Sequence, residues 1–549
     1  MSLNLFTALD VPWYLATIYA ALGATLVVLL THEVSRLLTQ STLSGIPGPT
    51  GLPIIGNLHQ VKGKPAFEVY RQWAKTYGPV FKIQLGSMPI VVVNDNDAAR
   101  ELFISQHSAV MSRPVTYTFH KTVNYIPTAE KHESPFETFS VGTSPWDASC
   151  KQKRRAAATA LNMTAVRTYA PILEFETKEF IRELFEEGNH GKNAVYLKPL
   201  IYHLSINMSL TLNYGTRLLT FDSPLFREIF EVEAAISKFR STSEHLADFF
   251  PFLRYNPFSG QSKYARDIGN RRKAVNYKLL DELQERIQQD TDRPCIIGNV
   301  LKDPQAKLSR KELLGVSMSI VAGADSNMPT LGWTIAYLIQ NPEWQSRLYQ
   351  ALKEHILEQG GDLNEGPGYA TAEENTIPII DAFVREILRF FPPLRMGIPR
   401  AAYKDTVYAG GNIPAGTEVL LNIWALNRDP AIFTDPETFD PYRWLDPVNK
   451  ANPRHYVYSF GLGARNCPAS FLTYRILYLS LIRLLWAFQL EAEPGTDGPD
   501  CHPIHGSKNT AALGQPIDDY NALLRPRNVE ALVEWLGEKP LAFGGLKSE

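Results

Sequence analysis

The chain has 549 residues, of which 44% are hydrophobic and 20% are charged, and its formal net charge is −2. These values are typical of a globular protein with a large core and lack the basic excess that marks nucleic-acid binding, so we expect no nucleic-acid partner. The four cysteines, at 150, 295, 467 and 501, show no paired spacing. This excludes a disulfide framework and a C-x-x-C zinc site, and it favours reducing surroundings.

The first predicted element is an apolar helix over residues 11–30, a stretch without a charged residue. At 1.5 Å per residue it is just long enough to cross a hydrocarbon core of about 30 Å. Trp13 and Tyr14 lie at one end, as interface anchors do. A secretory signal is the alternative, but its apolar part is usually shorter and follows basic residues, whereas residues 1–10 contain no Lys or Arg. The sequence therefore predicts a retained membrane anchor.

We expect three regions along the chain. Residues 1–43 form the anchor and its flank, residues 44–58 (SGIPGPTGLPIIGNL) form a stiff Pro/Gly-rich hinge, and residues 59–549 form one large domain. The sparse flanking charges favour a cytoplasmic position for that domain, on a single-pass membrane protein.

Helical patterns dominate the predicted domain. A β-hairpin is expected over residues 80–95, with its turn near Gly86. Pro329 is expected to interrupt and distort the longest of the helices. Helices are predicted over residues 67–77, 156–161, 172–187, 264–289, 311–340, 375–391 and 469–488, with short strands at 406–408 and 418–422. The expected fold class is therefore mainly α with small β-sheets.

Chemistry enters with residues 458–470, YSFGLGARNCPAS. A free cysteine such as Cys467 is usually a small buried hydrophobe. Here Gly461 and Gly463 allow a tight turn, and the cysteine directly precedes a predicted helix, whose N-terminal amides stabilise a thiolate. Arg465 adds a cation suited to a cofactor carboxylate. A thiolate held in this way is a competent axial ligand of haem iron.

Two further motifs precede this loop in the chain. In EILR, Glu386 and Arg389 lie three residues apart on one helix face, where they can pair. In FDPYRW, Arg443 can join that pair as a second cation. A solvated surface pair is the alternative for EILR, but its neighbours are apolar, and a buried triad is tolerated only when its charges satisfy one another.

Taken together, these motifs resemble the cytochrome P-450 superfamily of haem-thiolate monooxygenases, microsomal type. Phe460, Gly463, Arg465 and Cys467 match the haem loop Phe-x-x-Gly-x-Arg-x-Cys-x-Gly, with Ala469 in the last glycine position. EILR and FDPYRW match the Glu-x-x-Arg and Pro-x-Arg elements. The resemblance implies haem (heme b) as cofactor, with Cys467 as the iron ligand and Phe460 and Gly463 in the cofactor-binding loop.

The resemblance also implies an oxygen-activating segment in a long central helix. Ala322 and Gly323 would leave room for dioxygen, and Asp325 with Ser326 would provide a proton path. Ser326 replaces the threonine that is usual at its position, which keeps the hydroxyl but loses the methyl group that restricts its rotamer.

Haem carboxylates need cations, and the resemblance points to Arg465, Arg400 and a Trp/Arg pair before the central helices. If the RRAAA run sets the register of that pair, Arg154 takes the arginine position. If Trp146 sets it, Cys150 falls there and Lys151 substitutes. Arg154, with Trp146 about two turns earlier, is the preferred assignment.

The other cations of this stretch, Lys151, Lys153 and Arg155, are interpreted as a solvated basic face, which would also suit an acidic electron donor. No G-x-G-x-x-G follows a predicted strand in a βαβ unit, so electrons come from a partner. The resemblance implies the NADPH-dependent cytochrome P-450 reductase of the endoplasmic reticulum membrane, with cytochrome b5 as a possible second donor.

For the substrate, residues 142–162 look like fungal phenylacetate hydroxylases and related enzymes of secondary metabolism. This suggests a small aromatic acid or another small aromatic or apolar molecule. Residues 113–136 resemble the variable substrate loop of the family, with a plain surface loop as the alternative. The predicted pocket residues follow the end of the helix at 375–391; they are Leu394, Met396, Gly397 and Ile398.

Two alternatives to oxygen insertion remain at this stage. The same haem-thiolate fold can catalyse a rearrangement, ring closure or dehydration without a reductase, and the atypical AGADSN segment is compatible with such chemistry. A non-enzymatic interaction protein is the other alternative, but Glu386, Arg389 and Cys467 are all present, which argues against it.

Overall fold

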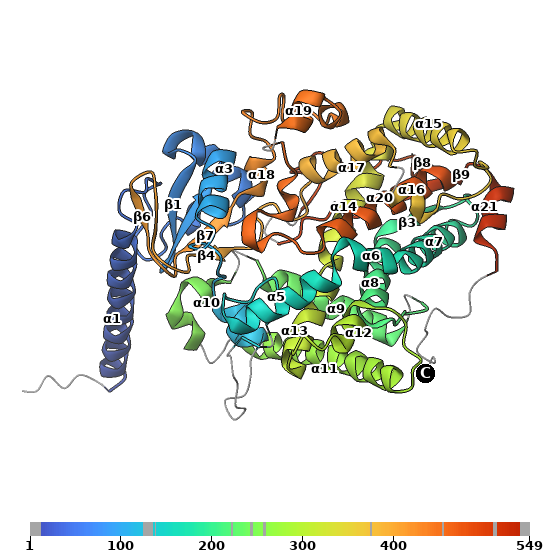
Figure 1. Cartoon of the computed structure of the whole chain (residues 1–549). Coiled ribbons are helices and arrows are strands. Elements are labelled where there is room, and N and C mark those ends of the chain that lie inside the picture. Colours follow the sequence, from blue (N-terminus) through green and yellow to red (C-terminus); the bar gives the residue numbers. More distant parts are fainter. Residues whose placement is uncertain are drawn as a thin grey trace, which may run out of the picture.

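The computed structural model describes residues 13–124, 136–137, 139–220, 223–241, 245–255, 260–373, 376–452, 455–508 and 513–538, without the side chains at 13, 16, 255, 324, 325, 372, 373 and 451. Within these residues a mainly helical body carries small sheets on two opposite sides, and helix α1 extends away from it (Figure 1). The predicted fold class is confirmed.

The helices are α1 Trp13–Thr42, α2 Leu58–Val61, α3 Ala66–Tyr77, α4 Asn96–Arg100, α5 Ala148–Ala160, α6 Met163–Thr168, α7 Ala170–Glu187, α8 Leu197–Tyr214, α9 Pro224–Phe239, α10 Leu246–Phe249, α11 Gln261–Gln288, α12 Ile296–Lys302, α13 Arg310–Val321, α14 Ala324–Gln340, α15 Pro342–Glu358, α16 Tyr369–Glu373, α17 Pro378–Phe390, α18 Ile423–Leu426, α19 Pro447–Ala451, α20 Ser470–Ala487 and α21 Val529–Leu536. The strands are β1 Val80–Leu85, β2 Met88–Val93, β3 Ala194–Tyr196, β4 Arg400–Ala401, β5 Thr406–Tyr408, β6 Gly411–Ile413, β7 Glu418–Leu421, β8 Phe488–Ala492 and β9 Asn521–Pro526.

The largest sheet has the strand order β1-β2-β7-β4. β1 and β2 form the predicted hairpin, in which Val80 pairs with Val93 and Gly86 turns the chain with a φ of 54°. β7 pairs with β2 in parallel and with β4 in antiparallel orientation. The sheet therefore joins the hairpin of the N-terminal region to the strands that follow α17. Smaller sheets have the orders β3-β9-β8 and β5-β6.

Helix α1 continues beyond the predicted apolar span. The part of this helix from Thr17 to Thr42 is long and apolar enough to cross a membrane, and only 6% of its most apolar stretch is buried against the rest of the protein. The last turns contact the body instead. His32 lies 3.0 Å from the carbonyl oxygen of Ile54, the amide of Ile54 donates to Glu33 at 2.6 Å, and Leu43 is buried. Helix α1 therefore leaves the body as a helix whose C-terminal turns are held by the backbone of Ile54.

The core lies between α8, α14, α17 and α20, which share one large hydrophobic cluster. α20 also passes a length and hydropathy test for membrane spans, but 72% of it is buried, so it is a core helix. It begins directly after the cysteine loop and ends one residue before the predicted end, at Ala487. The predicted helix at 156–161 begins earlier, at Ala148, because the side chain of Asp147 caps it through the amide of Cys150 at 2.7 Å.

The predicted central helix is interrupted, but not where Pro329 stands. The break lies at Ala322 and Gly323, between α13 and α14, where the amide of Gly323 donates to Ile320 at 2.9 Å in a tighter turn. Pro329 lies inside α14 and does not end it. The expected interruption of the helix at Pro329 was therefore wrong, and the tighter turn falls on the predicted oxygen-activating segment itself.

Candidate active site

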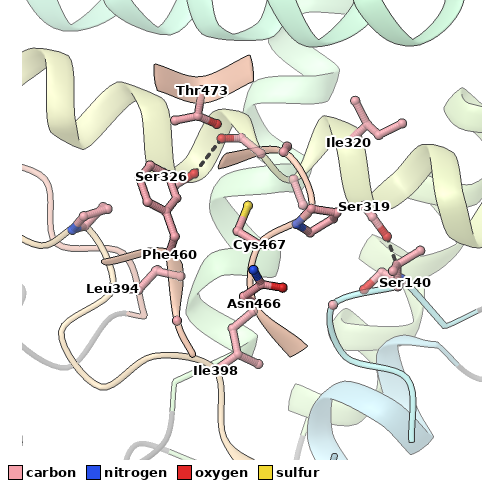
Figure 2. A pocket seen from close by; sticks show the side chains of 18 of the residues that line it. Ser140, Ser319, Ile320, Ser326, Leu394, Ile398, Phe460, Asn466, Cys467 and Thr473 are labelled. Atoms are coloured by element: carbon pink, nitrogen blue, oxygen red, sulfur yellow. Dashed lines mark hydrogen bonds between the residues drawn. The ribbon is translucent and has the colours of Figure 1, made fainter. Parts of the chain in front are cut away.

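One cavity lies between the central helices and the loop that precedes α20. Cys467, Ser326 and Leu394 come from three segments far apart in the chain, and all three line it (Figure 2). Most of its other lining residues are apolar, a composition typical of small-molecule sites. The structure thus brings the predicted cysteine loop, helix segment and pocket loop together.

The cysteine loop depends on two glycines in left-handed conformations. Gly461 has a φ of 76° and Gly463 a φ of 66°. A Cβ atom on Gly463 would lie 1.9 Å from the carbonyl oxygen of Phe103, so no side chain fits there. The amide of Cys467 donates to the carbonyl of Phe460 at 2.8 Å and closes the turn, which leaves both residues facing the cavity.

The Cys467 thiol has a pKa above its ordinary value, to which its surroundings contribute in opposite directions. Burial raises its pKa, while the amide of Ala469 and the charge of Arg154 lower it. Metal ligation needs the thiolate, so these two groups act in the direction that ligation requires. Ala469 itself has a φ of −96°, which any residue adopts, so the usual glycine is not needed at this position.

The cavity wall is rich in cations. Among the described residues that line it, none is Asp or Glu, whereas five are arginines: Arg113, Arg154, Arg240, Arg400 and Arg465. Burial and the neighbouring guanidinium groups lower the pKa of Arg400 to about 9. Burial likewise lowers the pKa of Arg465 to about 10. This concentration of positive charge calls for an anionic ligand.

Cavity arginines combine hydrogen bonds to backbone carbonyls with nitrogens that have no partner among the described residues. Arg154 donates to the carbonyls of Ala464 and Asn466 in the cysteine loop, at 3.1 and 3.4 Å. Buried nitrogens remain without a hydrogen-bond partner in the described part of the chain: Nε of Arg113, Nη1 of Arg400 and Nε of Arg465. Uncompensated buried cations are costly, and carboxylates of a bound group would satisfy them. A thiol on one wall, cations beside it and an apolar remainder fit haem.

Arg113 is a cavity residue that the sequence did not single out, beyond its place at the start of the predicted substrate loop. It donates to the carbonyls of Ile398 and of Pro399, the latter at 2.8 Å. Burial and the charges of Arg465 and Arg400 hold its pKa well below its ordinary value. No spacing rule marks it, because tertiary contacts alone bring it to the other cations. Residues 125–135 of the same loop lie outside the described residues.

The structure places the two members of the predicted Trp/Arg pair differently relative to the cavity. Arg154 lines the cavity, and Cys150 places its sulfur 3.5 Å from a nitrogen of Arg465. Trp146 is not among the cavity residues; its ring centre lies 5.9 Å from the guanidinium carbon of Arg465. The expectation that Trp146 contacts the cofactor is not supported, because its ring packs behind Arg465. Lys153 is fully buried, so the solvated basic face was wrongly predicted at this residue.

The break in the central helix borders the cavity. Ala322, Gly323 and Ser326 line it, and the Ser326 hydroxyl donates to the Gly323 carbonyl at 2.9 Å (Figure 2). A Cβ on Gly323 would come within 2.9 Å of the Ile320 carbonyl, which explains a glycine in this tight turn. The side chain of Asp325 lies outside the described part of the chain.

The predicted charge triad is formed. Glu386 and Arg389 are both fully buried in α17, with Nη2 of Arg389 2.7 Å from Oε1 of Glu386. Arg443 places its Nε 3.2 Å from the same oxygen. Arg389 also donates to the carbonyls of Asn427 and Pro436, both at 2.8 Å, and so ties α17 to the segment before the cysteine loop.

Three of the four predicted pocket residues line the cavity, namely Leu394, Gly397 and Ile398. Met396 does not; it packs into a separate hydrophobic cluster that also contains Phe67. The chain turns at residues 395–396, where the Gly397 amide donates to the Leu394 carbonyl at 3.1 Å, and this turn directs Met396 away from the cavity. The cavity wall also contains residues 140–143, of which the local resemblance over residues 142–162 had included only the last two.

Comparison with known proteins agrees with this geometry. A family model described as cytochrome P-450 matches residues 46–510. The chain is 39% identical over 495 residues to the 3-hydroxyphenylacetate 6-hydroxylase of Emericella nidulans, covering 90% of this chain and 91% of that protein. It is 36% identical over 501 residues to the phenylacetate 2-hydroxylase of the same organism, covering 90% and 93%.

A cytochrome P-450 monooxygenase of Mycosarcoma maydis is 38% identical over 528 residues, with 93% of both chains covered. These relatives are named as hydroxylases and monooxygenases, which favours oxygen insertion over rearrangement. The family match covers most of the chain and includes every motif around the cavity. The chain therefore belongs to the cytochrome P-450 family and is a haem-thiolate monooxygenase with an axial cysteine ligand.

Proposed function

We propose that the enzyme hydroxylates a small aromatic carboxylic acid, with phenylacetate and its ring-hydroxylated form as the first candidates. The observation that carries this proposal is a mainly apolar cavity beside Cys467 whose described charged lining consists of arginines. An apolar wall accepts an aromatic ring, and guanidinium groups recognise carboxylates. Arg240 also lines the cavity, and we assign it to the substrate carboxylate, whereas the other four arginines are assigned to the haem. Two relatives that match 90% of the chain are named for phenylacetate and 3-hydroxyphenylacetate, which supports the same class.

In this proposal the chain holds haem through Cys467 as the iron ligand, and through Arg154, Arg400 and Arg465 as partners of the haem carboxylates. Arg113 joins them, since its buried Nε lacks a partner. The haem, when bound, activates dioxygen, and thiolate ligation favours O–O cleavage. Phe460 and Gly463 shape the loop that carries the ligand, while Trp146 acts only through Arg465.

The tight turn between α13 and α14, with Ser326 just after it, supplies space and a hydroxyl. Ala322 and Gly323 leave the cavity free of large side chains, because neither carries an atom beyond Cβ. The Ser326 hydroxyl lines the cavity and donates its proton to the Gly323 carbonyl at 2.9 Å, so it passes a proton into the cavity only after it rotates away from that carbonyl. Asp325 is proposed as the acid that resupplies it. Glu386, Arg389 and Arg443 take no part in the chemistry and hold the cysteine loop in place.

Electrons come from a partner, for which we propose the NADPH-dependent cytochrome P-450 reductase, with cytochrome b5 as a second donor. The exposed apolar surface of α1 supports a single-pass anchor. We propose the endoplasmic reticulum membrane, with the catalytic domain in the cytoplasm. The division into an anchor at 1–43, a hinge at 44–58 and a catalytic domain at 59–549 belongs to the same proposal.

The test uses the full chain in microsomes with the reductase. We expect a red-shifted Soret band in the reduced carbon monoxide difference spectrum and NADPH-dependent hydroxylation of phenylacetate. Cys467→Ser should abolish both, because a hydroxyl does not replace the thiolate. The methyl ester of phenylacetate is the matched control for the carboxylate, and we expect it to react poorly. Product formed without NADPH, or equal turnover of acid and ester, would contradict the proposal.

A further inference from the structure

Lys153 is a buried charge whose place the mechanism above does not explain. It lies in α5 with 0% of its surface exposed. Its ammonium group donates to the carbonyls of Phe136, Glu137 and Phe139 at 2.8, 3.1 and 2.7 Å, and to the hydroxyl of Ser144 at 2.9 Å. Four oxygens thus surround one nitrogen, which satisfies a charge that would otherwise be costly to bury.

All four oxygens belong to one stretch of chain, residues 136–144, which we call the wall segment; the placement of residue 138 is not described. Residues 140–143 of this segment line the active-site cavity. Lys153 is not among the cavity residues, so it acts on the cavity only through the segment that it holds. Burial lowers the pKa of Lys153 to about 8, which leaves the side chain mostly protonated at neutral pH.

The opposite side of the wall segment rests on the central helix α13. The amide of Val141 donates to the Ser319 hydroxyl at 2.6 Å, and both ends of this bond are visible near Ser140 in Figure 2. A Cβ atom on Gly315 would lie 2.7 Å from the Phe139 carbonyl and 3.2 Å from Cδ of Lys153. The segment is therefore clamped between α5 and α13, with no room to shift toward the helix.

The cavity end of the wall segment has a third attachment. Arg465 donates to the carbonyls of Val141 and Ser144 at 3.1 and 2.9 Å. Arg465 lines the cavity itself, whereas Lys153 is not a cavity residue and holds both the carbonyls at the start of the segment and the Ser144 hydroxyl at its end. Loss of the Lys153 ammonium would leave three carbonyls and a hydroxyl without their shared donor, in a place that water does not reach from outside.

We propose that Lys153 is a positioning residue that fixes the wall segment and thereby the orientation of the substrate in the cavity. The inference rests on the proposed function in one respect, namely that the substrate occupies this cavity. Small displacements matter there, because a shift of about 1 Å in a bound substrate can cost up to about a hundredfold in rate. Lys153 would thus determine how much of the consumed NADPH ends in product.

The experiment compares Lys153→Met, which keeps the length of the side chain, with Lys151→Met, which removes an exposed lysine two residues earlier on the same helix. Both are made in the full-length holoenzyme in microsomes with the reductase. The readouts are the carbon monoxide spectrum, KM for phenylacetate, and the ratio of product to NADPH consumed. That ratio corrects for any change in electron delivery that loss of a surface charge causes.

For Lys153→Met we expect an intact carbon monoxide spectrum, a roughly tenfold higher KM and a roughly tenfold lower product-to-NADPH ratio. For Lys151→Met we expect wild-type KM and ratio. Amide hydrogen exchange should speed up in the wall segment of Lys153→Met only. Wild-type KM, ratio and exchange in a well-folded Lys153→Met enzyme would overturn the inference.

Two further arms keep the test decisive. If Lys153→Met does not fold, Ser319→Ala removes a single bond to the same segment and should change KM and the ratio in the same direction; unchanged values would overturn the inference. If the wild type converts no aromatic acid, the proposed function fails, and binding of phenylimidazole as a spectral probe replaces turnover. The Lys153→Met enzyme should then bind phenylimidazole about tenfold more weakly than Lys151→Met, and equal binding would refute the positioning role.

Discussion

The buried carboxylate of Glu386 offers the sharpest test of how this fold holds its cysteine loop. It accepts bonds from two nitrogens of Arg389 at 2.7 and 2.8 Å, and from Nε of Arg443 at 3.2 Å. The amide of Asp440 and the indole of Trp444 add bonds at 2.8 and 2.9 Å. Glu386→Gln keeps the size of this side chain but removes its charge and turns one acceptor into a donor that faces other donors.

The expected loss follows from burial. Removing one partner of a buried ion pair costs about 3–5 kcal/mol, because the remaining charge stays buried without compensation, and here two guanidinium groups remain. That is a large part of a typical net stability of about 5–15 kcal/mol. Burial opposes ionisation of Glu386, but Arg389 and Arg443 outweigh it and lower its pKa. The contribution of the ionised Glu386 to the free energy of unfolding is therefore complete at neutral pH, and it disappears as the pH falls through the lowered pKa of this carboxyl group.

The assay is urea unfolding of the holoenzyme at pH 7, followed by circular dichroism and by the carbon monoxide spectrum. Arg385→Gln is the matched control, since it removes the pair of Arg385 with Asp381 from the same helix, where the two side chains are 45% and 25% exposed. Exposed pairs contribute about 0–1 kcal/mol. Equal unfolding midpoints for Glu386→Gln and Arg385→Gln at pH 7 would refute the argument that Glu386 compensates buried charge. An equal loss of stability of these two variants between pH 7 and acid pH would refute it as well.

Three further predictions address the cavity and the anchor. Ser326→Ala should lower the product-to-NADPH ratio at least about tenfold while Ser326→Thr retains it, measured by product and peroxide yields; an unchanged ratio in the alanine variant would exclude the hydroxyl from proton delivery. Glu418 is buried beside a second cavity, and burial with the charge of Asp248 raises its pKa to about 8. The folded state then holds a proton that the unfolded chain releases, so the free energy of unfolding should fall as the pH rises from about 4.5 to 8. In urea titrations Glu418→Gln should be more stable than the wild type by up to about 4 kcal/mol at pH 8, but by little at pH 5. Deletion of residues 1–30 should move the protein from the membrane to the soluble fraction with its carbon monoxide spectrum intact, whereas deletion of 1–43 should also lower the thermal midpoint, because it removes the buried Leu43 and the Glu33 bond to Ile54.

Much of the fold could be predicted from local sequence features. The hairpin turn at Gly86, the length of α20 and the cysteine loop follow from backbone conformations that only a few residue types adopt, and these leave a direct trace in the chain. The charge triad could also be foreseen, because Glu386 and Arg389 share a helix face among apolar neighbours. Pro329 misled for the opposite reason. A proline marks a lost hydrogen bond, but the tight turn formed at Gly323, where only a small residue fits against the Ile320 carbonyl.

The sequence by itself thus determined the family, the cysteine ligand and the order of the motifs, since each rests on residues close together in the chain. Tertiary structure alone decided which side chains reach the cavity. It placed Arg113 beside Arg400 and Arg465, turned Met396 away, and put Trp146 behind an arginine. It also buried Lys153 in a run of basic residues that reads as a solvated face. Whether a side chain is buried depends on what packs against its helix. For Lys153 the packing partner is a segment that binds it mainly through backbone carbonyl groups, which every residue type has and which therefore leave no signal in the sequence.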